Sequence, residues 1–219
     1  MMTKFRWGGM DKYTLHLDEN AMRMSMNLRI QFTRLAEALA VEGKNDSALA
    51  VIDKCVEVMP HENVPYDFLM YQMADLYTQL GEFEKATPIM DKLIEVNKGN
   101  VRYYLNLDKF RLKAFEQDYQ QSQAILLQIS ETYYRNDRTA EAHEVMAFLA
   151  GLLDDDLAKF YQPEEDILSN RDKLLQTTME WLSHLHRITS TYNDSVLADS
   201  IREIITIANQ NLIEAPTLE

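Results

Sequence analysis

The sequence predicts an all-α fold made of helical hairpins that longer C-terminal helices continue or cap. Only six glycines and five prolines occur among 219 residues, so few positions suit the tight turns of a sheet protein. Apolar residues recur at intervals of three and four over most of the chain, which is the period of an amphipathic helix. In addition, the segment 35–60 returns in varied form at 73–98. A fixed return interval is typical of a repeat architecture.

The first hairpin is predicted between Asp18 and Pro60. Asp18 or Asn20 is the expected cap of its first helix, which carries apolar residues at helical spacing and ends near Gly43. A second helix follows from residue 48 to residue 59, and Pro60 stops it because proline has no N–H to continue the hydrogen-bond pattern.

The second hairpin repeats the first at a constant interval of 38 residues. Ala74 follows Ala36 at this interval, and the turn residue Gly81 follows Gly43 in the same way. With the large residues around them, these positions resemble the tetratricopeptide pattern, whose regular repeat is about 34 residues long. The four extra residues fall within 61–67. Two such repeats cannot bury all their apolar surface alone, so the remaining helices must cap or extend them.

The rest of the chain is predicted as further helices. Residues 118–129 resemble the second helix of a degenerate third repeat, and residues 101–108 form a short apolar-aromatic element before it. Longer helices are expected at about 118–135, 138–160, 164–190 and 194–212. The expected domains are a juxtamembrane-like lead-in (1–18), tetratricopeptide-like repeats (19–117) and a C-terminal helical region packed on the repeats (118–219).

Charge and composition exclude some classes of function. The formal net charge is −13, which argues against nucleic-acid binding because recognition of phosphates needs a basic surface. The single Cys55 cannot form an intrachain disulfide, so cysteine usage leaves the compartment open. No run of about 18 apolar residues occurs that would span a membrane.

No arrangement of residues typical of catalysis or cofactor binding is found, so we expect no enzyme activity, metal or cofactor in this chain. The five histidines never stand four apart, the spacing that places two zinc ligands on one helix face. Cys55 falls where the second helix of a repeat packs inward, which favours an inert thiol over a nucleophile. The acidic clusters at 154–156 and 164–166 favour solvated charge over a calcium site.

A binding face is expected on the first helix of each repeat, because the first helices line the concave surface of such a stack. Its outward residues are mixed in charge and polarity, which suits an extended peptide or a neighbouring domain, with a tyrosine for stacking. The alternative is that the C-terminal helices cover this face. The candidate partner-binding residues are Arg34, Glu37, Tyr71, Gln72, Asp75 and Gln79.

Several sequence segments resemble segments found in one particular protein family. MMTKFRWG, LDENAMRM, FTRLAEALAVEGK, VMPHENVPYD and YYLNLD are similar to the C-terminal region of large multi-spanning membrane proteins of Bacteroidetes, formerly of unknown function and now grouped with protein O-mannosyltransferase-like proteins. The likeness covers residues 1–110. It implies that the chain is the soluble tail of a membrane-embedded glycosyltransferase of the C superfamily, with the catalytic residues outside this sequence, on the periplasmic face of the inner membrane.

The same resemblance suggests which residues meet the membrane domain or an acceptor protein. Two of its phrases lie outside the packing positions of the repeats. A structural role is the alternative, in which the proline turns the chain, the tyrosines pack and the aspartates cap helices. The lead-in would descend from the last spanning helix, with Phe5 to Trp7 at the bilayer edge, or it is a frayed terminus. The candidate residues are Pro65, Tyr66, Asp67, Tyr103, Tyr104 and Asp108.

Two functions follow as hypotheses. The first is a non-catalytic protein–protein interaction module that is the tail of the membrane glycosyltransferase and binds acceptor protein or docks on its own membrane domain. The second is a free-standing, cytoplasmic tetratricopeptide scaffold that joins soluble proteins and is unrelated to glycosylation. In both, the partner is a protein or peptide rather than a nucleic acid or a small molecule.

Overall fold

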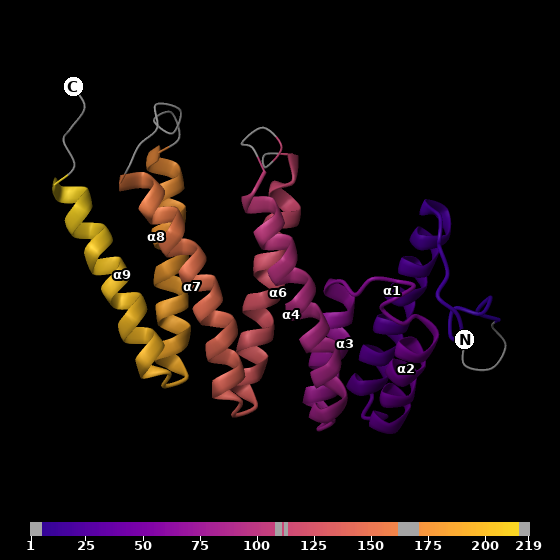
Figure 1. The fold of residues 1–219 in the computed structure, drawn as a ribbon. Coiled ribbons are helices and arrows are strands. Elements are labelled where there is room, and N and C mark those ends of the chain that lie inside the picture. The colour runs from indigo at the N-terminus through magenta and orange to yellow at the C-terminus, as the bar shows by residue number, and fades with distance from the viewer. Residues whose placement is uncertain (1–5, 108–110, 112–113, 162–170, 215–219) are drawn as a thin grey trace. The chain divides into compact units, whose positions relative to one another are not determined.

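The structure is a computed structural model that describes residues 6–107, 111, 114–161 and 171–214. All regular secondary structure in these residues is helical (Figure 1), which confirms the predicted all-α fold. The first half contains α1 (Glu19–Val41), α2 (Asn45–Val58), α3 (Phe68–Gln79) and α4 (Phe83–Leu105). The second half contains α6 (Glu116–Arg135), α7 (Thr139–Tyr161), α8 (Arg171–Thr191) and α9 (Ser195–Glu214).

The chain divides into two compact units, Met1–Lys113 and Ala114–Glu219. In the first unit α1 packs on α2, α3 packs on α4, and the two first helices α1 and α3 also touch each other. In the second unit α6 pairs with α7 and α8 with α9, while α7 contacts both α8 and α9. Over the residues that the structure describes, each unit therefore contains two helical hairpins.

All four hairpins close with the same turn. Its central residue has a positive φ, between 58° and 85°, and is Gly43, Gly81, Asp137 or Asn193. In the first hairpin the Lys44 N–H donates to the Leu39 carbonyl at 2.9 Å, and the corresponding bond measures 2.8–2.9 Å in the other three. This hydrogen bond joins the first and last of six residues and encloses a residue in the left-handed conformation. It is characteristic of the Schellman motif, which satisfies the free carbonyls at a helix end.

A buried alanine follows each turn at the same distance. It lies five residues after the left-handed residue, where the second helix of the hairpin crosses the first. A small side chain here lets two helices approach closely. These alanines are Ala48, Ala86, Ala142 and Ala198, each at most 3% exposed.

Two expectations about the middle of the chain are wrong. Residues 101–105 continue α4 instead of forming a separate element. Residues 116–135 form the first helix of a hairpin, α6, and not the second helix of a degenerate third repeat. The misassignment arose because apolar spacing identifies a helix but not its place in a hairpin, and only the turn at Asp137 shows that α6 comes first.

Both hairpins contribute side chains to the core of the first unit. Phe32, Ala36, Ile52, Met73 and Leu93 are each fully buried. None of the described helices is long and apolar enough to cross a membrane. The two units meet in sequence at residue 113, four residues before the expected boundary, and the packing of the second region on the repeats stays a prediction.

Candidate protein-binding face and inter-repeat loop

The outward surface of α1 and α3 forms what we call the first-helix face, defined by five of the six predicted groove residues together with Val41: Arg34, Glu37, Gln72, Asp75, Gln79 and Val41. Because the two helices keep the 38-residue register and touch each other, Glu37 and Asp75 occupy equivalent positions. Of the groove residues, Arg34, Glu37 and Gln79 are exposed, whereas Gln72 and Asp75 are half-buried. The face carries both signs of charge.

Tyr71 is not part of the exposed surface, contrary to the expectation from the sequence. Its side chain is 7% exposed, and its ring centroid lies 6.0 Å from that of Phe68. The equivalent residue on α1, Thr33, is also buried. This register position therefore points into the first unit. The exposed apolar area comes instead from Val41, which is 89% exposed at the position equivalent to Gln79.

Asp75 is held in a defined orientation. Gln79 donates from Nε2 to Asp75 Oδ2 at 2.7 Å, and the Thr78 hydroxyl donates to the Asp75 carbonyl at 2.7 Å. The Gln79 bond, between residues one turn apart, orients the carboxylate near the end of α3. A basic or amide group of a partner would meet a carboxylate that is already positioned.

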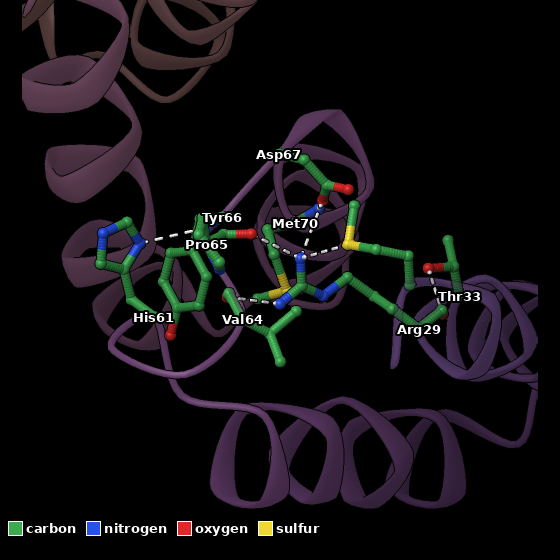
Figure 2. A network of polar contacts seen from close by, with 9 residues as sticks. Arg29, Thr33, His61, Val64, Pro65, Tyr66, Asp67 and Met70 are labelled. Carbon is green, nitrogen blue, oxygen red and sulfur yellow. Dashed lines mark hydrogen bonds and ion pairs between the residues drawn. The ribbon is translucent and has the colours of Figure 1, made fainter. Parts of the chain in front are cut away.

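The second candidate region is the inter-repeat loop, residues 60–67, which joins α2 to α3. Arg29 of α1 reaches into it with a side chain that is fully buried (Figure 2). Its Nη2 donates to the Val64 carbonyl at 2.8 Å and its Nη1 to the Pro65 carbonyl at 2.8 Å. Nη1 also lies 3.2 Å from Asp67 Oδ1. One guanidinium group thus binds three residues of the loop to α1.

Asp67 has the structural role that the sequence left open. It is the N-cap of α3, since its Oδ1 accepts from the Met70 N–H at 3.3 Å, and it forms the ion pair with Arg29. A carboxylate at this position satisfies a free amide and interacts favourably with the positive end of the helix. The contact of Asp67 with the membrane domain or an acceptor protein stays a prediction.

His61 and Tyr66 pack against each other within the loop (Figure 2). The Tyr66 N–H donates to His61 Nδ1 at 3.1 Å, and the two rings meet edge to face at 5.1 Å. Burial, with a smaller contribution from the Lys92 charge, holds the pKa of His61 below its usual value. Burial also raises the pKa of Tyr66. The Arg29 guanidinium lies 5.9 Å from the Tyr66 ring, within cation–π distance.

The other phrase taken from the family resemblance lies at the end of α4. Tyr103 and Tyr104 stand in its last turn with ring centroids 5.5 Å apart, and Tyr103 is 59% exposed. This exposure makes Tyr103 the more accessible of the two aromatic candidates. Asp108 lies outside the described residues.

A tyrosine–aspartate bond joins the two hairpins of the first unit. The Tyr77 hydroxyl on α3 donates to Asp53 Oδ1 on α2 at 2.6 Å, and Lys85 Nζ lies 3.0 Å from Asp53 Oδ2. Burial and the bond to the carboxylate raise the pKa of Tyr77. In the second unit the Tyr134 hydroxyl donates to Asp194 Oδ2 at 2.7 Å, and His143 Nδ1 lies 2.9 Å from the same oxygen.

Cys55 lies fully buried on α2, beside Arg29 and Asp67. Burial raises the pKa of its thiol to about 12, although the Arg29 charge opposes this. A thiol that stays protonated at neutral pH is a poor nucleophile and a poor metal ligand. Among the residues that the structure describes, no group of three or more histidine, cysteine or acidic side chains could hold a metal ion.

Arg29 and Asn63 were not predicted as important residues. The sequence contains an indication of the role of Arg29, because this residue lies between Ser25 and Phe32, at helical spacing, on the buried side of α1. A charged residue in such a stripe requires a buried partner. Asn63 had no local signal, since its hydrogen-bond partners are main-chain groups 48–53 residues away.

Comparisons with known proteins agree with the hairpin geometry. No curated protein and no solved structure matches the chain significantly. These two comparisons therefore give no support to the resemblance with the Bacteroidetes membrane proteins, and that resemblance stays a prediction. A comparison with known families matches residues 69–100 to the family described as tetratricopeptide repeat. Residues 69–100, which span α3 and most of α4, are thus a tetratricopeptide repeat, the second of the two that the 38-residue interval predicted.

Proposed function

We propose that this chain is a protein-binding module that forms the soluble tail of a membrane-embedded glycosyltransferase, on the periplasmic face of the inner membrane. Tetratricopeptide repeats generally mediate binding between proteins and are typically non-catalytic, and residues 69–100 are such a repeat. The tail would bind acceptor protein or dock on the membrane domain of the same protein. The support for the glycosyltransferase context is the set of sequence phrases that resemble that family.

The observation that carries the binding proposal is the composition of the first-helix face. It combines exposed charges of both signs on Arg34 and Glu37 with the exposed apolar Val41 and a positioned carboxylate on Asp75. An extended peptide offers side chains on alternate faces and main-chain polar groups between them, so a mixed surface can bind it specifically. The stacking role assigned to Tyr71 has no place in this proposal, because its ring is buried.

Site-specific photocrosslinking in cells tests the face directly. A benzophenone amino acid at Val41 or Gln79 should form covalent adducts with the partner, because both side chains point outward from the face. Val196 on α9 is the matched control, since it is a valine that is 72% exposed and lies in the other unit. Adducts at Val196 as abundant as those at Val41, or none at either position of the face, would contradict the proposal.

Charge reversal then separates binding from stability. The double variant Glu37→Lys, Asp75→Lys should weaken partner capture at least tenfold, while the melting temperature stays within a few degrees because both carboxylates lie outside the core. The parent protein is tested separately by the reading frame upstream of the Met1 codon. Ten or more hydrophobic spans in frame support the glycosyltransferase tail, and a ribosome-binding site directly before Met1 supports the free-standing scaffold.

A further inference from the structure

A segment ahead of the first hairpin is held against it by an unusual set of contacts. We call residues 7–15 the strap. They form no helix, and they run beside α1 and the inter-repeat loop within the first unit (Figure 1). The strap is bound mainly by Ser25, Phe32 and Asn63, which together we call the cradle.

Both polar groups of the Asn63 side chain form hydrogen bonds with the main chain of the strap. Its amide nitrogen donates to the Met10 carbonyl at 2.7 Å and to the Tyr13 carbonyl at 2.7 Å. Its amide oxygen accepts from the Leu15 N–H at 2.6 Å. Asn63 is only 4% exposed. A buried asparagine whose polar groups all bind main chain recognises a conformation, and not the side chains at those positions.

That conformation is a tight turn that glycine makes possible. The Met10 N–H donates to the Trp7 carbonyl at 3.1 Å, which closes a four-residue turn with Gly8 and Gly9 at its centre. Both glycines have positive φ, 63° and 88°. Two consecutive positive φ values define a type I′ turn, which other residues enter only with strain.

Two side chains anchor the turn on α1. The Trp7 ring lies 5.8 Å from the fully buried Phe32 ring, and the buried Met10 sulfur lies 3.9 Å from the Ser25 hydroxyl. The other side chains of the strap are mostly exposed, and Tyr13 is 67% exposed. The strap thus has two apolar anchors and three main-chain bonds, which is the kind of contact made by a short bound peptide.

We propose that the cradle is a peptide-binding site for a Trp-Gly-Gly-Met-type turn, and that the strap is a tethered ligand that occupies it and can exchange. Of the core residues named above, Phe32 contacts the strap, whereas Ala36, Ile52, Met73 and Leu93 are no part of the cradle, so opening the strap does not require unfolding the hairpins. Segments with few buried apolar contacts open locally at low free energy. The tether gives the strap an effective concentration of about millimolar, so a peptide in trans gains access only when the strap is released.

Severing the tether in the folded protein tests the exchange. A site-specific protease sequence is inserted after His16, which is exposed, and the purified full chain is cut after folding. The cut strap should separate on gel filtration while the helical circular dichroism persists. A fluorescent peptide of residues 6–16 should then bind the strap-free protein saturably and the uncut protein hardly at all.

Matched variants identify the contacts. Asn63→Ala should abolish peptide binding, whereas Asn27→Ala, the same change at an exposed position of α1, should leave it unchanged. A peptide with L-alanine in place of Gly8 should bind roughly tenfold more weakly, because an L residue is strained at positive φ. The peptide with D-alanine there favours positive φ and should bind as well as the parent peptide.

Each contrary result overturns the proposal. The strap would be a permanent part of the fold if it stayed bound after cutting, or if helical structure were lost with it. A folded, strap-free protein that ignores the peptide, or that binds it unchanged after Asn63→Ala, would show that no cradle exists. In the uncut chain, hydrogen exchange at the Leu15 amide should be at least tenfold faster than in the core of α1. Exchange only through global unfolding would also refute the proposal. None of these tests uses the first-helix face, so their failure leaves the proposed function standing.

Discussion

At the scale of single residues, the inter-repeat loop depends on one buried charge. Arg29 donates to two carbonyls and pairs with Asp67, and its guanidinium group has no exposed surface. Removing the guanidinium group leaves the Val64 and Pro65 carbonyls without this donor and takes the ion-pair partner from Asp67, which keeps its bond to the Met70 N–H. Each buried acceptor left without a donor costs about 1–3 kcal/mol. The extra residues that lengthen the interval from about 34 to 38 are therefore held in one conformation by a residue of the preceding helix.

His61 makes the loop sensitive to acid. Its pKa is below the usual 6.5 in the folded chain, mainly because of burial, so the folded state favours the neutral ring and the unfolded state binds the proton more readily. The neutral ring accepts the Tyr66 N–H, a bond that a protonated Nδ1 cannot accept. The stabilisation is complete above about pH 6.5 and is lost as the pH falls through the lowered pKa.

We predict that His61→Asn removes this loss. Asparagine offers an acceptor oxygen close to the position of Nδ1 but does not titrate, so the variant and the wild type should differ little at pH 8. Between pH 7 and 5 the wild type should lose stability relative to the variant, as measured by urea unfolding at each pH. Lys92→Gln should make the loss smaller, because the Lys92 charge lowers the pKa of His61 and its removal brings the folded pKa closer to the unfolded value. If the unfolding free energies of the wild type and of His61→Asn changed with pH in parallel, His61 would not be the group that makes the loop sensitive to acid.

At the scale of the elements, the turn motif defines the four hairpins better than any side-chain pattern. Two of the turns use glycine at the left-handed position, and two use Asp137 and Asn193. Asparagine and aspartate are the residues that tolerate this region best after glycine. The glycines of the first two turns were recognised from the sequence, whereas the equivalent role of Asp137 and Asn193 became clear only from their backbone angles.

We predict that alanine at the turn glycines destabilises the chain although it has room. No atom lies within 4 Å of a Cβ built at Gly43 or Gly81, so the cost is the positive φ alone, about 1–2 kcal/mol. Gly99 is the matched control. It lies exposed within α4, and Gly99→Ala should stabilise by about 1 kcal/mol because alanine favours the helix. Chemical denaturation measures all three variants, and an equal effect at Gly43 and Gly99 would contradict the argument.

At the scale of the whole molecule, the chain is two units with separate buried cores. Ile52 and Leu93 are fully buried in the first unit, and Leu126 and Ile129 are fully buried in the second. Each unit has about the size of a small domain, which can fold alone when it has its own core. The family match lies wholly within the first unit, although the hairpin turn is the same in both.

We predict that fragments 1–113 and 114–219 fold independently. Each should show a helical circular dichroism spectrum and a cooperative thermal transition, because its hairpins bury their apolar faces against each other. Leu93→Ala in the first fragment should lower its unfolding free energy by about 2–5 kcal/mol, the usual cost of a large-to-small change in a core. A fragment that is unfolded alone but folded in the full chain would show that its core depends on the other unit.

The all-α class, the two-hairpin interval of 38 residues and the inert environment of Cys55 were all predictable from the sequence. These features depend on local periodicity and on turn glycines, which act over short distances along the chain. Tertiary structure alone decided that Tyr71 is buried, that α6 begins a hairpin, and that Arg29 and Asn63 organise the loop and the strap. Arg29 and Asn63 bind main-chain groups that lie 35–53 residues away in the sequence. A carbonyl carries no residue-specific signal in the sequence, so only the folded chain shows which side chain binds it.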